Sequence, residues 1–286
     1  MPIDPAVALG ATLPALTSSW DTDDVILYHL GIGAGLGKPT DPDELAYTYE
    51  RNLKVLPSFA VIPPFGALVS AVMGQLPGVD INPALVLHGE QDLELHRPLP
   101  TTATVEHRPR ISSLHDKGKA ALVTLEVPSG DPGGDPWFTN RFTIFARGEG
   151  GFGGEPAPPP GNEPPSRDAD AVVESPTMSH QALIYRLSGD KNPLHADPEF
   201  ARFGGFDTPI LHGLCTYGIV CKAVVDTLLD GDVAAVSRYK VRFAGVVFPG
   251  ETVVTSMWRE GDRIVLSAST RERGLPVLAN AAIWTR

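Results

Sequence analysis

Hydrophobic and polar positions in the second half of the chain predict one long helix and several strands. Residues 214–229 are apolar round much of a helical circumference, which is typical of a buried helix. Residues 263–270 and 277–284 carry apolar and β-branched side chains with polar ones interleaved, which is typical of strands. We therefore expect one long buried helix and at least two strands in this half.

The first half follows the same plan with one departure. Residues 120–127 and 137–146 have the composition of strands. Residues 56–76 stand where the second half has its long helix, but they contain Pro63 and Pro64. Proline breaks a helix because it lacks an N–H and its ring clashes with the preceding turn. The helix here should be shorter or kinked, and the pattern as a whole predicts an α+β fold.

The two halves resemble a diverged internal repeat joined by a linker. Residues 26–31 read Ile-Leu-Tyr-His-Leu-Gly and residues 183–188 read Leu-Ile-Tyr-Arg-Leu-Ser, each near the start of its half. Between the halves, the glycine-rich residues 148–154 precede a proline-rich stretch that supports neither a helix nor a central strand. These features predict a first unit at 1–150, a linker at 151–170 and a second unit at 171–286.

Composition and charge narrow the class of protein. The chain has 286 residues, of which 42% are hydrophobic, and a formal net charge of −11. This acidic balance argues against a nucleic acid or an anionic membrane surface as the main partner. Cys215 and Cys221 lie in the apolar helical run, where a helix points them in different directions. We therefore expect neither a disulfide framework nor a metal site.

The sequence is also informative about location. Residues 55–79 are uncharged and mostly apolar, but Pro63 and Pro64 at their centre would break a spanning helix, so we expect no membrane span. The first residues lack a basic segment ahead of an apolar core, and the last residues are not a peroxisomal tripeptide. We expect a cytoplasmic protein.

Residues 185–195 hold the candidate chemistry and read Tyr-Arg-Leu-Ser-Gly-Asp-Lys-Asn-Pro-Leu-His. Gly189 permits a tight turn and Pro193 restricts the backbone, so the side chains between them keep a defined relation. Two proton-handling groups of different intrinsic pKa on one rigid loop are what addition or elimination of water requires. The alternative interpretation is ordinary turn chemistry, because Gly-Asp-x-Asn-Pro is also a common turn sequence. The carboxylate, amide and imidazole of this loop belong to Asp190, Asn192 and His195.

The motif continues as Ala-Asp-Pro-Glu-Phe-Ala at residues 196–201, and the whole string resembles the signature of the MaoC-like hydratases, the hydratase 2 family of (R)-specific 2-enoyl-CoA hydratases. The resemblance implies a double hot-dog fold, in which each half is an antiparallel sheet wrapped around a central helix. It also implies reversible addition of water to trans-2-enoyl-CoA in fatty-acid or sterol side-chain metabolism. Coenzyme A is then part of the substrate, and neither a further cofactor nor a metal is expected.

The resemblance implies a role for each residue of the loop. We expect Asp190 to take a proton from water, His195 to act as the acid at C2 and Asn192 to orient the water, while the reverse assignment of Asp190 and His195 stays open. Gly213, at the start of the long helix, would offer its backbone N–H to the thioester oxygen, because a helix N-terminus carries partial positive charge. The alternative for Gly213 is a plain helix-start glycine.

Substrate contacts are also implied by the resemblance. Lys117 is expected to contact a phosphate or the pantetheine of coenzyme A, with a solvated turn lysine as the alternative. A core histidine is the alternative for His88, and plain packing is the alternative for Phe243. The four implied substrate-binding residues are His88, Gly89, Lys117 and Phe243.

The interrupted helix of the first half suggests where an acyl group would lie. The part of the helix that is missing there would leave a cavity for a long or bulky acyl chain. The alternative is a well-packed irregular core. The small residues expected to border the cavity are Gly66, Ala67, Ala71 and Gly74.

Two other functions use the same fold and ligand class. One is a hot-dog thioesterase, which would hydrolyse the acyl-CoA but gains nothing from Asp190, Asn192 and His195 together. The other is a non-catalytic acyl-CoA-binding partner subunit, although here the catalytic residues are present. We expect a homodimer of the double unit, with a monomer as the alternative because the chain contains its own pair of hot-dog units.

Overall fold

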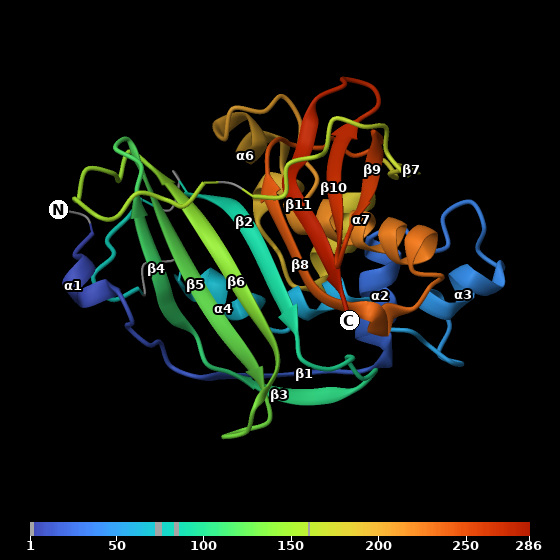
Figure 1. Ribbon diagram of the computed structural model, residues 1–286, viewed down its shortest axis with the longest axis horizontal. Helices are drawn as coiled ribbons and strands as arrows, with labels where there is room; N and C mark the ends of the chain where they lie inside the picture. The colour runs from blue at the N-terminus through green and yellow to red at the C-terminus, as the bar shows by residue number, and fades with distance from the viewer. Residues whose placement is uncertain (1–2, 72–75, 83–85, 160) are drawn as a thin grey trace.

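The structure of the protein is a computed structural model that describes residues 3–71, 76–82, 86–159 and 161–286 (Figure 1). Within these residues, strands from both halves form one sheet in the order β1-β3-β5-β6-β2-β8-β11-β10-β9-β7, with β4 paired to β5. The strands are β1 (Leu16–Trp20), β2 (Val86–Leu95), β3 (Ala103–His107), β4 (Arg110–Asp116), β5 (Ala120–Gly130), β6 (Pro136–Arg147), β7 (Ala171–Pro176), β8 (Val236–Phe243), β9 (Thr252–Glu260), β10 (Arg263–Thr270) and β11 (Pro276–Thr285). The four strands predicted from the sequence are confirmed as β5, β6, β10 and β11.

Helices cover the sheet and fill its concave side. The α-helices are α1 (Pro5–Ala8), α2 (Thr22–Gly31), α3 (Pro42–Thr48), α4 (Phe65–Ser70), α5 (Gln181–Tyr185), α6 (Pro198–Phe203) and α7 (Gly213–Leu228). Short 3₁₀ segments are η1 (Pro57–Val61), η4 (Arg186–Ser188), η5 (Pro193–His195) and η6 (Val233–Ala235). None of the helices in the described part of the chain is long and apolar enough to span a membrane.

The central helix of the second half is α7, and the predicted buried helix is confirmed there. Tyr217 and Val220 of α7 are fully buried, in a core cluster that also includes Tyr28 of the first half. A Cβ at Gly218 would lie 2.6 Å from the Tyr28 hydroxyl, so glycine lets α2 approach α7 closely. The antiparallel sheet around α7 is the hot-dog arrangement expected for this half.

The helix of the first half is short, as predicted. The 3₁₀ segment η1 and the helix α4 stand where the second half has α7, and the Pro63–Pro64 pair lies between them. Ala67 and Ala71 are buried in a second core cluster. Gly66 is exposed, and Gly74 lies outside the described residues. The acyl cavity expected beside these small residues stays a prediction.

The contacts between the two halves include a pair of strands and a pair of helices. β2 and β8 pair antiparallel, with Glu90 opposite Arg242, and so join both halves into a continuous sheet. The repeated segments α2 and α5 pack together, because the Gln181 amide donates a 2.6 Å hydrogen bond to the Gly31 carbonyl. Figure 1 shows the strands of the first half beside those of the second, with α7 behind the latter. The candidate loop follows α5 directly and is therefore anchored to both halves.

The segment after the candidate loop folds into the short helix α6. The Asp197 carboxylate accepts a 2.8 Å hydrogen bond from the Glu199 N–H and caps α6, which ends at Phe203 before Gly204. In the linker, the Asp116 carboxylate accepts hydrogen bonds from the N–H groups of Gly151 and Gly153. These bonds tie the glycine-rich segment to the β4–β5 turn. The boundaries at residues 150 and 170 stay a prediction.

Candidate active site

The loop that carries Asp190 is held by its own side chains. Gly189 has φ 133°, a backbone conformation that favours glycine, and it turns the chain out of η4. The Asp190 Oδ1 then accepts a 3.1 Å hydrogen bond from the Asn192 N–H, and the Asn192 Oδ1 accepts a 3.0 Å bond from the Leu194 N–H. These bonds cap η5, which presents His195. The local turn chemistry and the candidate chemistry therefore use the same residues.

His195 is buried and has a defined tautomer. Its Nδ1 lies 2.9 Å from the Ile210 carbonyl oxygen. A carbonyl only accepts hydrogen bonds, so Nδ1 carries the proton and Nε2 of the neutral ring is left as an acceptor. Burial lowers the pKa of His195, with a further small contribution from the positive charge of Arg186, while the negative charge of Asp190 opposes the shift. His195 is therefore a neutral base near pH 7.

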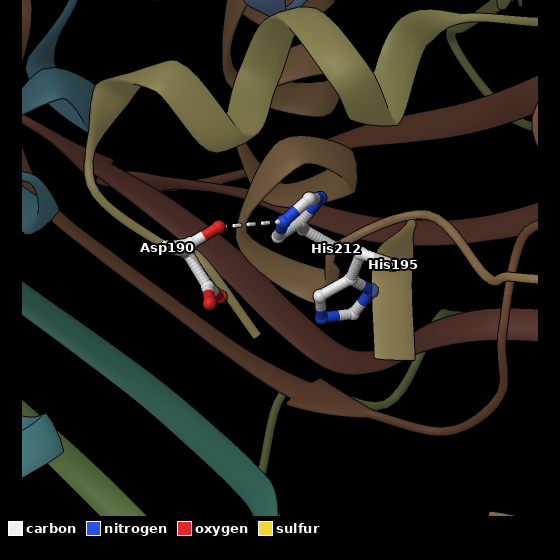
Figure 2. Close-up of side chains that lie close together, drawn as sticks. All are labelled: Asp190, His195 and His212. Atoms are coloured by element: carbon white, nitrogen blue, oxygen red, sulfur yellow. Dashed lines mark hydrogen bonds between the residues drawn. The ribbon is translucent and has the colours of Figure 1, made fainter. Parts of the chain in front are cut away.

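Asp190, His195 and His212 come together at the start of α7. One oxygen or nitrogen atom of each side chain lies within 4.8 Å of the others. Figure 2 shows the two imidazole rings one against the other with the Asp190 carboxylate beside them. The rings stack with centroids 3.7 Å apart and planes at 29°. His212 Nε2 donates a 3.2 Å hydrogen bond to the backbone carbonyl of Asp190.

This cluster has the residue types of a metal site but not the geometry. The nitrogen lone pairs of an imidazole lie in the ring plane. The rings of His195 and His212 stack with their planes at 29°, so their lone pairs point in nearly parallel directions and do not converge on one metal position. One nitrogen of each ring is also engaged by a backbone carbonyl. The arrangement therefore suits hydrogen bonding and proton transfer.

Gly213 offers a free backbone donor next to these groups. The carbonyl of His212 accepts the N–H groups of Cys215 and Thr216, whereas the Gly213 N–H makes no hydrogen bond to a described residue. Gly213 is exposed although His212 and Leu214 on either side are buried. The first N–H groups of a helix carry partial positive charge, so an anionic oxygen is stabilised there.

Phe243 and His88 border this donor. A Cβ at Gly213 would lie 3.1 Å from the Phe243 ring, and the centroids of the Phe243 and His88 rings are 4.8 Å apart. His88 Nε2 donates a 3.1 Å hydrogen bond to the Glu90 carbonyl, and burial lowers the pKa of His88 to about 4. His88 is therefore a neutral ring at the edge of the site.

Gly89 and Lys117 have local structural explanations. Gly89 is the bulged residue of β2, because the register with β6 shifts between His88 and Glu90. Lys117 is an exposed residue of the β4–β5 turn, whose N–H donates to the Ala120 carbonyl. This turn lies at the same end of the sheet as His88, because β5 pairs with β6 and β6 pairs with β2. None of the described contacts joins Lys117 to the cluster of Asp190, His195 and His212.

His212 is the residue that the sequence did not single out. Its only sequence signal was its position directly before the glycine that opens the long helix. The structure shows that His212 is 1% exposed. Burial is the main cause that lowers the pKa of His212 to about 2, and the neighbouring His195 lowers it further. His212 is therefore neutral and contacts both proton-handling residues.

A continuous antiparallel sheet built from two halves, one long central helix and an Asp-Asn-His loop at its start define a MaoC-like dehydratase. Residues 18–148 match the MFE-2 hydratase 2 N-terminal domain, and residues 161–281 match the MaoC-like domain. The chain belongs to the family of MaoC-like hydratases of the hydratase 2 type, and its fold is the double hot dog.

Relatives of this family match over nearly the full chain. The enoyl-CoA hydratase ChsH3 of Mycobacterium tuberculosis is 47% identical, with 96% of each chain covered. The peroxisomal enoyl-CoA hydratase 2 of Arabidopsis thaliana is 43% identical over 95% of this chain and 92% of its own. Among solved structures, a MaoC-like dehydratase from Phytophthora capsici superposes with a TM-score of 0.88 at 32% identity and covers 99% of this chain and 98% of its own.

Proposed function

We propose that this protein is an (R)-specific 2-enoyl-CoA hydratase, which reversibly adds water to trans-2-enoyl-CoA in fatty-acid or sterol side-chain metabolism. The observation that carries the proposal is the neutral His195 with Nε2 unprotonated, beside the Asp190 carboxylate and the free Gly213 N–H. The names of the relatives that match over nearly the full chain, both enoyl-CoA hydratases, support it. The (R) configuration of the product rests on the family resemblance.

In the proposed reaction one proton passes from water to His195 and then from His195 to the substrate. A water between Asp190 and His195 gives a proton to His195 Nε2 as its oxygen bonds to C3. The electron pair of the double bond moves onto the thioester oxygen, which the Gly213 N–H stabilises. The imidazolium, stabilised by the Asp190 carboxylate, then returns the proton to C2. The lowered pKa of His195 favours this order over Asp190 as the first base, which was the sequence expectation.

Asn192 has one group left for the proposed water. Its Oδ1 already accepts the Leu194 N–H, so only the amide Nδ2 can orient a water as a donor. We propose that Asn192 both shapes the loop and directs the water oxygen toward C3. A change of Asn192 to Asp keeps the Oδ1 cap and removes the donor.

The remaining substrate contacts are assigned by position. We propose that His88 and Phe243 border the thioester, because they line the approach to Gly213. We propose that Gly89, the bulged residue next to His88 in β2, also contacts the substrate. We propose Lys117 as a contact for the phosphates or pantetheine of coenzyme A, because its turn is exposed at the same sheet end.

The thioesterase alternative is separated by one assay. Incubation with crotonyl-CoA is followed in parallel by loss of the enoyl absorbance and by release of free thiol. A hydratase removes the double bond without releasing thiol. Thiol release without loss of the double bond would overturn the proposal, and no change in either signal would support a non-catalytic acyl-CoA-binding subunit.

Assembly and location remain predictions. We propose a homodimer of the double unit, which light scattering of the purified protein would test against a monomer. We propose a cytoplasmic location, which fractionation of cells that make the protein would test.

A further inference from the structure

His212 contacts Asp190 and His195 and directly precedes Gly213 in the chain. Its Nε2 donates to the Asp190 backbone, its ring stacks on His195, and its carbonyl accepts the first helical bonds of α7 directly before Gly213. The Tyr185 ring lies on it as well, with centroids 4.9 Å apart. The loop of Asp190, the proposed proton acceptor His195 and the proposed oxyanion donor Gly213 are therefore linked through one residue.

We propose that His212 is a positioning residue that holds Asp190, His195 and Gly213 in the one arrangement that hydration requires; this inference rests on the proposed function. His212 is 1% exposed, so it has no access to a substrate and acts only through its neighbours. Misplacement of a reacting group by about 1 Å can cost a reaction about 100-fold in rate.

The hydrogen bonding of His212 is unlike that of a satisfied core histidine. Its Nδ1 is buried and has no hydrogen-bond partner among the described residues. A buried polar atom without a partner destabilises the folded state. By contrast, His107 in β3 is also 1% exposed but has both ring nitrogens bonded, to Ser18 and Ser129. The unpartnered Nδ1 therefore gives His212 a cost in stability that the fully bonded His107 does not carry.

The stacking of His212 on His195 affects the electrostatic stability of protonated His195. When His195 takes a proton, the face of a neutral ring beneath it attracts the imidazolium, whereas a charged ring would repel it. Burial keeps His212 neutral, so the stack favours the protonated intermediate. The other charged groups that act on His195 are Asp190, which favours its protonation, and Arg186, which opposes it.

Two variants separate the two contacts of His212. His212→Phe keeps an aromatic ring against His195 and removes the donor to the Asp190 carbonyl. His212→Gln keeps an amide donor and removes the ring that shields His195 from water. His107→Gln is the matched control, because His107 is equally buried but lies far from the site. His107 pairs with Ser129 near one end of β5, whereas His88 is in register with Val123 near the other end.

The experiment measures kcat, KM and their pH dependence with crotonyl-CoA, together with Tm. We expect His212→Phe to lower kcat about 100-fold with KM near that of the parent and Tm not reduced, because it also removes the unpartnered Nδ1. We expect His212→Gln to raise the midpoint of the acid limb of kcat/KM toward 6.5, because water then reaches His195. His107→Gln should lower Tm and leave kcat and the acid limb unchanged.

Parental kcat and pH profile in both His212 variants would overturn the inference, as would losses of kcat that only follow losses of Tm. An inactive parent protein would instead overturn the proposed function. Ring ¹⁵N shifts of the parent test the geometry in either case: we expect a neutral His212 at pH 5 with its proton on Nε2. A proton on Nδ1, or titration of His212 near pH 6.5, would contradict the inference.

Discussion

The Nδ1 of His195 donates a 2.9 Å hydrogen bond to the carbonyl oxygen of Ile210, two residues before His212. This bond fixes which nitrogen of His195 is free to take a proton. The acceptor is a backbone atom in the segment that leads into α7, so the orientation of the ring is coupled to the position of the helix start. The proposed proton acceptor His195 and the proposed oxyanion donor Gly213 are thereby positioned by one short stretch of chain.

The pH dependence of the reaction should follow His195. Because the folded pKa of His195 is lowered below its ordinary value of 6.5, the neutral base is present at pH 6.5 and above, and kcat/KM should fall only below pH 6.5. Arg186 contributes to the lowering, so Arg186→Met should move this acid limb to higher pH, while Arg186→Lys keeps the charge and should leave it in place. An acid limb that stays unmoved in Arg186→Met would contradict this electrostatic role.

Loss of either proton-handling residue should abolish most of the activity. We expect Asp190→Asn and His195→Gln each to lower kcat for crotonyl-CoA by about 100-fold or more, the usual contribution of a positioned acid or base. Far-ultraviolet circular dichroism should confirm that both variants fold. Parental kcat in both variants would show that the loop has no catalytic role.

A methyl group at position 213 should block the oxyanion donor. Gly213→Ala places a Cβ 3.1 Å from the Phe243 ring, in the space through which the thioester approaches the N–H. We expect kcat to fall on the order of 100-fold. Gly161→Ala is the control, because a Cβ at this exposed linker glycine meets no atom within 4 Å and should leave kcat unchanged. Equal kcat in the two variants would exclude Gly213 as a donor.

An ion pair between Asp92 and Arg238 crosses the seam between the halves, where β2 pairs with β8. Asp92 of β2 accepts hydrogen bonds of 2.8 and 2.6 Å from Arg238 of β8, and Asp92 is 7% exposed. Asp92→Asn leaves a guanidinium without its carboxylate, so we expect the free energy of unfolding in urea to fall by about 1–2 kcal/mol. The control is Glu174→Gln, whose exposed pair with Arg271 should be worth less than about 1 kcal/mol. Equal losses in the two variants would contradict a special role of the seam.

Much of the second half could be predicted because its signals are local. The apolar positions of α7 repeat with helical spacing. The strands β10 and β11 are rich in apolar and β-branched residues, and Asp197 followed by Pro198 is a helix start in itself. The interruption of the first-half helix followed in the same way from two adjacent prolines. Each of these features depends on residues within one or two turns of chain.

The features that were missed depend on residues far apart in the sequence. The His212 bond to Asp190 joins positions 22 apart, and the Asp92–Arg238 pair joins positions 146 apart. The bulge at Gly89 exists only relative to its partner strand β6. A sequence shows that a histidine precedes a helix-start glycine, but only the packing of α7 against the loop shows where its ring lies.

The most direct measurement is a structure of the protein with a non-hydratable enoyl-CoA analogue. The account predicts that the thioester oxygen lies about 3 Å from the Gly213 N–H, with C3 and C2 facing Asp190 and His195 Nε2. A thioester oxygen bound away from Gly213, or a double bond remote from both side chains, would contradict it.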